Sequence, residues 1–191
     1  MTAGAERGWA LRAVADAEGS ESGVSPDQLR AGMAHFASGV TVVTTVLAGT
    51  RHAMTATAFT SVSLQPPLVL VCVGRRSRFH PAVLAAGRWA VSVLSADQRW
   101  IADHFARNGR ELSTQFDGVD HDPAPFSGAP VLHGAQTWLD CRTWAVQEAG
   151  DHTIVVGLVL AVGDFAAVGD ASPGTGSRPP LTYHRGSYQG L

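Results

Sequence analysis

The chain has 191 residues, of which 45% are hydrophobic and 16% are charged, and its formal net charge is −2. This length suits one globular domain and is short for two. All 14 basic residues are arginine, and the lack of lysine excludes a pyridoxal phosphate Schiff base and a P-loop.

Positive charge is not concentrated in any part of the chain, since the longest run of like charge is the pair Arg75-Arg76. We therefore expect neither a nucleic-acid groove nor a membrane-binding surface. The longest apolar run, residues 68–73, is far shorter than the roughly 20 residues that span a bilayer. The amino terminus lacks the apolar segment of a secretory signal. These features predict a soluble cytoplasmic protein, in which Cys72 and Cys141 are reduced core thiols.

The first predicted element of the domain is a helix that follows an extension. Residues 1–24 are rich in Ala, Gly, Ser and acidic side chains, which is typical of a mobile segment. The sequence Ser-Pro-Asp-Gln at 25–28 then predicts a capped helix start. We expect this helix to run to about Ala37 and to end at Gly39, within a single domain over 25–191. Its apolar residues share one face: Leu29, Met33 and Phe36.

The remaining chain is dominated by short β elements. Strands are predicted at residues 40–47, 52–57, 60–64, 68–73, 88–94, 136–147 and 152–166, with a hairpin turn at 148–151. Helices are predicted from residue 77 or 80 to 86 and at 96–107. The other segments are a Pro/Gly-rich connection at 116–130, an exposed loop at 169–180, and a last short strand or tail at 181–188. Because strands outnumber helices and follow one another directly, the fold is predicted to be mainly β, a barrel-like sheet with a few peripheral helices.

Three segments could carry chemistry, and each also has an ordinary structural interpretation. Residues 54–63 hold five hydroxyl side chains among small residues, which suits a flat ligand with a polar edge or simply a Thr-rich strand. Residues 75–78, Arg-Arg-Ser-Arg, precede a helix and could form a phosphate site or a solvated basic turn. His152 follows the hairpin turn and could bind a carboxamide or relay a proton, although most such histidines are surface residues.

Other chemistry is not indicated. The dinucleotide motif G-x-G-x-x-G, the hydrolase motif G-x-S-x-G and the zinc-protease motif H-E-x-x-H are all absent from the sequence. The spacing of His121, Asp122, His133 and Cys141 matches no recurring set of ligands, so no metal site is expected.

Taken in order, these segments resemble the flavin reductase-like family with the FMN-binding split-barrel fold. Its members are small NAD(P)H:flavin oxidoreductases that serve two-component flavin monooxygenases. The resemblance covers residues 27 to 191 and is carried by six segments: 38–45, 54–63, 66–71, 98–105, 150–153 and 180–188.

The resemblance implies a role for particular residues. The flavin, FMN or FAD, would be lined by Thr55, Ala56, Thr57, Ser61, Val62 and Ser63, and its phosphate side would be held by Ser77 and Arg78. NADH or NADPH would be bound near Gly150, Asp151, His152, Tyr183 and Arg185, with His152 as the catalytic residue that orients the nicotinamide. Phe79 departs from the family, which often has a hydroxyl there, and the 169–180 loop is longer than usual. The resemblance also implies a homodimer that passes reduced flavin to a monooxygenase.

Two other functions are compatible with this resemblance. One is an FMN-dependent oxidase or reductase that holds its flavin tightly and acts on another substrate. The other is a flavin-binding module without enzymatic activity, in which His152 is only a turn residue.

Overall fold

The computed structural model describes residues 23–163 and 178–190. Its helices in these ranges are α1 (Pro26–Met33), α2 (Phe79–Ala86) and α3 (Arg99–Ala106), with the short 3₁₀ helix η1 (Ala96–Gln98). Its strands are β1 (Ser38–Gly39), β2 (Thr41–Leu47), β3 (Thr50–Ala56), β4 (Phe59–Leu64), β5 (Pro67–Gly74), β6 (Arg88–Val93), β7 (His121–Pro123), β8 (Pro130–Leu132), β9 (Thr137–Ala149), β10 (His152–Gly163), β11 (Leu181–His184) and β12 (Ser187–Gly190). Most of the predicted extension and of the predicted 169–180 loop lies outside the described residues. No helix of the described residues is long and apolar enough to cross a membrane.

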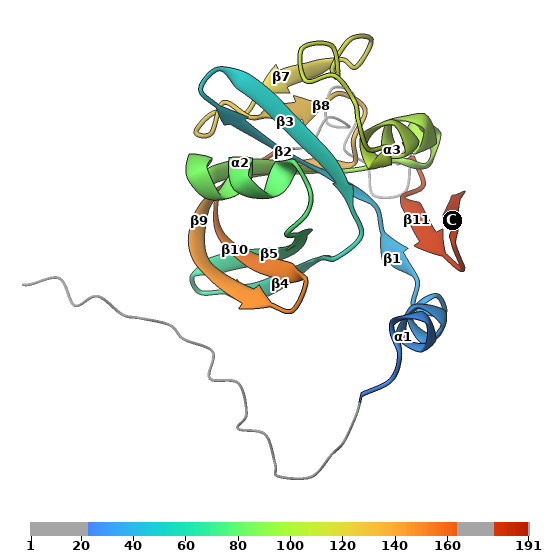
Figure 1. The fold of residues 1–191 in the computed structure, drawn as a ribbon. Helices are drawn as coiled ribbons and strands as arrows, with labels where there is room; N and C mark the ends of the chain where they lie inside the picture. Colours follow the sequence, from blue (N-terminus) through green and yellow to red (C-terminus); the bar gives the residue numbers. More distant parts are fainter. Residues whose placement is uncertain (1–22, 164–177, 191) are drawn as a thin grey trace, which may run out of the picture.

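The largest sheet is antiparallel and curves into an incompletely closed barrel. Among the described residues it has seven strands in the order β3-β2-β6-β9-β10-β5-β4. Strands β3 and β4 follow each other in the chain, separated only by Thr57 and Ala58, yet they lie at opposite edges of this sheet. Helix α2 packs against β2, β3, β5 and β6, and the sheet curves around it (Figure 1). The mainly β prediction is confirmed, and the barrel is split rather than closed.

Two hydrophobic cores lie on the two faces of β2. The alternation of side chains along a strand sends Val43 into the core beneath α2 and Val42 into the core beneath α3. This explains why β2 is apolar or Thr-rich throughout, rather than alternating with charged residues. Its buried hydroxyls are satisfied, since Thr41 Oγ1 donates to Ala56 O at 2.8 Å and Thr45 Oγ1 donates to Arg88 O at 2.6 Å.

The first helix begins where predicted and ends early. The capping box is present, with Gln28 N donating to Ser25 Oγ at 3.2 Å. The helix ends at Met33, so the prediction of a helix to Ala37 was wrong. A tertiary contact is the reason: Arg185 N donates to Ala34 O at 2.8 Å, and the chain then turns to pair Ser38 with Tyr183.

Two hairpins were not predicted. The connection at 116–130 contains β7, which pairs with β8, and the segment at 181–188 forms the hairpin of β11 and β12 rather than one strand or tail. The three-stranded sheet β1-β11-β12 lies beside α1 (Figure 1). The long hairpin of β9 and β10 follows the prediction, with Gly150 at its turn in the left-handed conformation (φ +61°) that glycine adopts without strain.

Candidate functional site

The hydroxyl-rich segment, residues 54–63, connects β3 to β4, the two edge strands between which the barrel is open. Thr55 and Ala56 end β3, Thr57 lies in the connection, and β4 carries Ser61, Val62 and Ser63. Thr55 Oγ1 donates to Ala102 O of α3 at 2.7 Å, so this hydroxyl fastens the strand to a helix. The register of β4 against β5 shifts between Ser61 and Ser63, and most of β4 is exposed at the sheet edge. A bulge at an exposed edge re-aims side chains and leaves backbone groups open to a ligand.

A cavity of about 440 Å³ lies between β3, the start of α2 and the loop after α3, and we call it the arginine cavity. Its lining includes the predicted residues Thr55, Ser77 and Arg78, together with Arg76 of the same basic turn. It adds three basic residues that the sequence did not single out: His52, Arg107 and Arg110. Among the described residues that line it, none is acidic.

The charges in the arginine cavity are not compensated. Of the described carboxylates, none forms an ion pair with Arg76, Arg78, Arg107 or Arg110. Burial lowers the pKa of Arg110 from its ordinary value, and the charge of Arg78 lowers it further. Burial also lowers the pKa of His52, again with a contribution from Arg78. An anion bound here would relieve this repulsion, so the cavity has the electrostatic character of an anion site.

His152 lies at the tip of the β9–β10 hairpin with Asp151. Its Nδ1–H donates to Asp151 Oδ1 at 2.8 Å, and this hydrogen bond is the first cause that lowers the pKa of the exposed Asp151 carboxyl. The bond fixes the tautomer, because the neutral ring then carries its lone pair on Nε2. The ring lies against Gly74, where a Cβ would be 3.6 Å from His152 Nε2.

A second cavity, of about 650 Å³, lies between α1 and the β11–β12 hairpin. Tyr183 and Arg185 line it together with Thr57. Its walls include apolar side chains of α1 and of the turn after it, such as Met33 and Phe36. This cavity therefore brings one predicted flavin residue together with two predicted nicotinamide residues.

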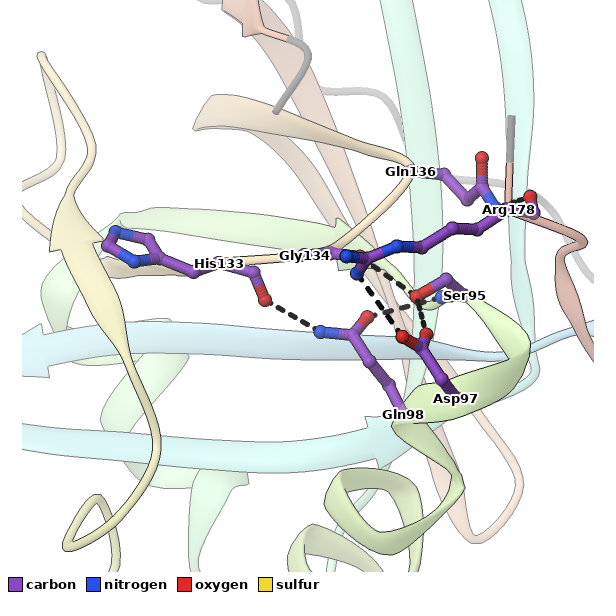
Figure 2. A network of polar contacts seen from close by, with 7 residues as sticks. All are labelled: Ser95, Asp97, Gln98, His133, Gly134, Gln136 and Arg178. Carbon is purple, nitrogen blue, oxygen red and sulfur yellow. Dashed lines mark hydrogen bonds and ion pairs between the residues drawn. The ribbon is translucent and has the colours of Figure 1, made fainter. Parts of the chain in front are cut away.

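A polar network fastens the chain that leads into the β11–β12 hairpin (Figure 2). Arg178 Nη1 pairs with Asp97 Oδ2 at 3.2 Å, and Gln136 donates to Arg178 O. Ser95 Oγ donates to Asp97 Oδ1 at 2.6 Å, which holds the carboxylate in place. The buried Gln98 ties the same turn to the chain after β8 by donating to His133 O at 2.7 Å. The network thus fixes where the hairpin with Tyr183 and Arg185 begins.

The predicted site residues do not share one cavity. Thr55, Ser77 and Arg78 share the arginine cavity, whereas Thr57, Tyr183 and Arg185 share the cavity beside α1. The remainder line neither of these two cavities: Ala56, Ser61, Val62, Ser63, Gly150, Asp151 and His152. The structure therefore does not place His152 in the same cavity as Tyr183.

The sequence matches the model of a known protein family. The model of the "Flavin reductase like domain" matches residues 33–191. The chain belongs to this family.

Relatives of this flavin reductase-like protein support the assignment. It is 47% identical over 134 residues to an "NADH-dependent FAD reductase" of Streptomyces globisporus, covering 70% of this chain and 73% of that protein. It is 34% identical over 169 residues to "Flavin-dependent monooxygenase, reductase subunit HsaB" of Mycobacterium tuberculosis, covering 88% and 83%. Among solved structures, it resembles Streptomyces globisporus "NADH:FAD oxidoreductase SgcE6 in complex with NAD and FAD fragments", with 38% identity and a TM-score of 0.76 over 89% of this chain and 96% of that one.

The departure at Phe79 has a structural explanation in this flavin reductase-like protein. Phe79 begins α2 and is 3% exposed, packed in the core inside the barrel. Its side chain therefore stabilises the helix that follows Ser77 and Arg78. It offers no hydroxyl to the arginine cavity, in which Ser77 and the cationic side chains remain as groups that could contact an anion.

Proposed function

We propose that this protein is an NAD(P)H:flavin oxidoreductase that reduces FMN or FAD and supplies the reduced flavin to a partner monooxygenase. One observation carries the proposal: an uncompensated arginine cavity opens beside the hydroxyl-rich segment where the barrel is split. The relatives named above are NADH-dependent reductases, and one of them is the reductase subunit of a flavin-dependent monooxygenase. We regard flavin as the substrate and NADH as the preferred donor on this basis.

The residues of the arginine cavity fit a flavin nucleotide. The buried atoms His52 Nδ1 and Arg110 Nε have no hydrogen-bond partner among the described residues, and both residues line the cavity. Such groups are costly to leave unpaired and are usually satisfied by a ligand or water. Ser77 and Arg78 would hold the phosphate. The flavin ring would then lie along residues 55–63, where small side chains let it approach the backbone.

His152 has the geometry of a nicotinamide-binding residue. Because Nδ1–H is donated to Asp151, Nε2 is left to accept an N–H of the carboxamide. When both nucleotides are bound, the nicotinamide supplies a hydride and the flavin accepts it, so the protein has to bind and orient the two rings. Among the described residues, no carboxylate lines the arginine cavity, and the carboxylate that lines the cavity beside α1, Asp27, is paired with Arg30.

We further propose a homodimer. Three apolar side chains of α1 and the turn after it are exposed: Leu29 (57%), Met33 (54%) and Phe36 (67%). A second copy that covers this face would also approach Tyr183 and Arg185, which line the adjoining cavity. A flavin site shared between two subunits would bring together predicted site residues that lie in separate cavities of a single chain. Measurement of the mass in solution tests this, and a monomer at working concentration would contradict it.

Two further proposals concern the bounds of the domain and the cellular compartment of the protein. We propose that residues 25–191 form the reductase domain, because the family model covers 33–191 and the described helix α1 begins at Pro26. We propose that the protein works in the cytoplasm, where free thiols such as Cys72 and Cys141 stay reduced.

The experiment that tests the function is NADH consumption by the purified protein, with and without added FMN, FAD or riboflavin. Rapid consumption that depends on added flavin is expected. Protein that retains its flavin and oxidises NADH only with another substrate would instead show a tightly bound cofactor. Flavin binding without any NADH or NADPH consumption would refute the reductase and leave a binding module.

A further inference from the structure

His80, the second residue of α2, connects the basic turn at 75–78 to the β9–β10 hairpin. Its backbone N–H donates to Ser77 Oγ and to Ser77 O, each at 3.2 Å. Its ring reaches in the other direction, where Nε2 lies 2.8 Å from Thr153 Oγ1, within hydrogen-bond distance. His80 therefore joins a residue of the basic turn to the residue that directly follows His152.

Thr153 is the buried neighbour of an exposed histidine. Thr153 is 1% exposed, whereas the side chain of His152 is 49% exposed. Side chains alternate along a strand, so Thr153 points toward α2 inside the barrel and His152 points to the opposite face of β10. The hydrogen bond between His80 and Thr153 is thereby shielded from water, although it lies only one residue from the hairpin tip.

The backbone at this tip has few hydrogen bonds of its own. His152 is the first residue of β10 and pairs with Gly74, the last residue of β5. Beyond this pair, Arg75 N donates to Asp151 O at 3.0 Å. Because the ends of strands open at a low cost in free energy, these backbone bonds alone leave the position of His152 weakly held.

Among the described residues, two side-chain contacts join the hairpin to the basic turn and α2. Arg75 Nη1 lies 3.4 Å from Glu148 Oε2, and both side chains of this pair are largely exposed. Such exposed pairs contribute little to stability. The contact between His80 and Thr153 is shorter and is buried on the threonine side, so it is the stronger restraint on the start of β10.

We infer that His80 is a positioning residue for the reaction: its hydrogen bond to Thr153 holds the backbone of His152 where the imidazole can meet the nicotinamide. The inference rests on the proposed function, in which His152 binds the carboxamide of NADH. His80 contacts the face of β10 opposite to His152, so it acts through the strand and does not touch the nicotinamide.

The test is the steady-state kinetics of NADH oxidation with added FMN, for variants that remove or keep this hydrogen bond. Thr153→Val removes the hydroxyl at nearly constant volume and should raise KM for NADH about twofold to tenfold, the effect of losing one neutral hydrogen bond. Thr153→Ser keeps the hydroxyl and should restore most of the wild-type KM. The dissociation constant of FMN, measured without NADH by fluorescence quenching, should stay unchanged in both variants.

His80 gives a second pair of variants, and the exposed ion pair gives the control. The amide nitrogen of Gln lies near the position of the imidazole Nε2, whereas the amide of Asn falls short of it. His80→Gln should therefore keep KM for NADH closer to the wild-type value than His80→Asn. Glu148→Gln is the matched control, because it removes the exposed contact between the same elements and should leave KM unchanged.

Measurement in the His152→Ala background separates positioning from a general structural role. If Thr153 acts through His152, adding Thr153→Val to His152→Ala should leave KM for NADH at the value of His152→Ala alone. The same fold increase in both backgrounds would show that Thr153 only stabilises the barrel, and this would overturn the inference.

The outcomes separate this inference from the proposed function. A wild-type protein that consumes no NADH with any flavin refutes the reductase itself. A wild-type protein that reduces flavin, with KM for NADH unchanged by Thr153→Val, refutes only the role of His80. Thr153→Val that weakens FMN binding as much as it raises KM for NADH also refutes that role. A rise in KM for NADH alone, which disappears when His152 is absent, supports it.

Discussion

Gly157 of β10 lies against Trp89, and this contact allows a quantitative prediction. A Cβ added at Gly157 would be closer than 3.0 Å to the indole ring of Trp89 and 3.1 Å from the Cβ of Cys141. Both neighbours are fully buried in the core inside the barrel. We therefore expect Gly157→Ala to overpack the core of the strand that begins with His152.

The expected cost follows from the packing. Overpacking a core costs about 1–3 kcal/mol, and a fully buried indole that cannot move places Gly157→Ala near the upper end. The smaller conformational freedom of alanine in the unfolded chain offsets roughly 0.4–1 kcal/mol. A net loss of about 2 kcal/mol corresponds to a decrease in Tm of roughly 4–8 °C for a domain of this size. Thermal unfolding followed by circular dichroism measures it.

Two further variants make the test specific. Gly32→Ala adds a methyl group where no atom lies within 4 Å, in a helix where alanine is favoured, so its Tm should be unchanged or higher. Trp89→Phe in the Gly157→Ala background removes the crowded part of the indole, so the two changes should cost less together than the sum of each alone. An unchanged Tm for Gly157→Ala, or strict additivity with Trp89→Phe, would refute the packing argument.

Three more predictions concern the site and its surroundings. His152→Ala should raise KM for NADH more than it changes the dissociation constant of the flavin, and unchanged steady-state kinetics would remove His152 from the site. Arg178→Gln should speed hydrogen exchange in the β11–β12 hairpin while changing Tm by no more than about 4 °C, because both partners of the Arg178–Asp97 pair are more than half exposed and such pairs contribute at most about 1 kcal/mol. Burial, with the neighbouring Asp140 carboxylate, raises the pKa of Cys141 to about 12. Its thiolate is therefore almost absent at pH 8, and iodoacetamide should label Cys141 in the native protein far more slowly than in denatured protein.

Most of the sheet could be predicted because its strands carry their own local signals. The β9–β10 hairpin has long β-rich segments and a Gly-Asp turn, and both the strands and the turn were identified. β7 and β8 were missed because each has only three residues, and their proline-containing segments pair across a loop. The end of α1 was misplaced for a similar reason, since a hydrogen bond from Arg185 stops the helix.

Some residues of the candidate site belong to a local sequence pattern, whereas others are brought to the site only by the fold. Ser77 and Arg78 could be proposed from the sequence because a basic turn before a helix is a local pattern, and both line the arginine cavity. His52 and Arg110 could not, because they are distant in the sequence and belong to no motif. The curvature of the sheet and the fold of the loop after α3 bring them together. The arginine-rich end of α3 was the one available signal, and without the fold it looks like an ordinary solvated helix end.

The arginine cavity has a consequence for how the protein can be regulated. A pocket built from lysine loses its charge in alkaline solution and can be silenced by acetylation. Guanidinium groups stay protonated at any pH at which a protein is folded, and this chain has no lysine side chain for an acetyltransferase to modify. Neither lysine acetylation nor a mildly alkaline solution would therefore reduce the positive charge of the arginine cavity.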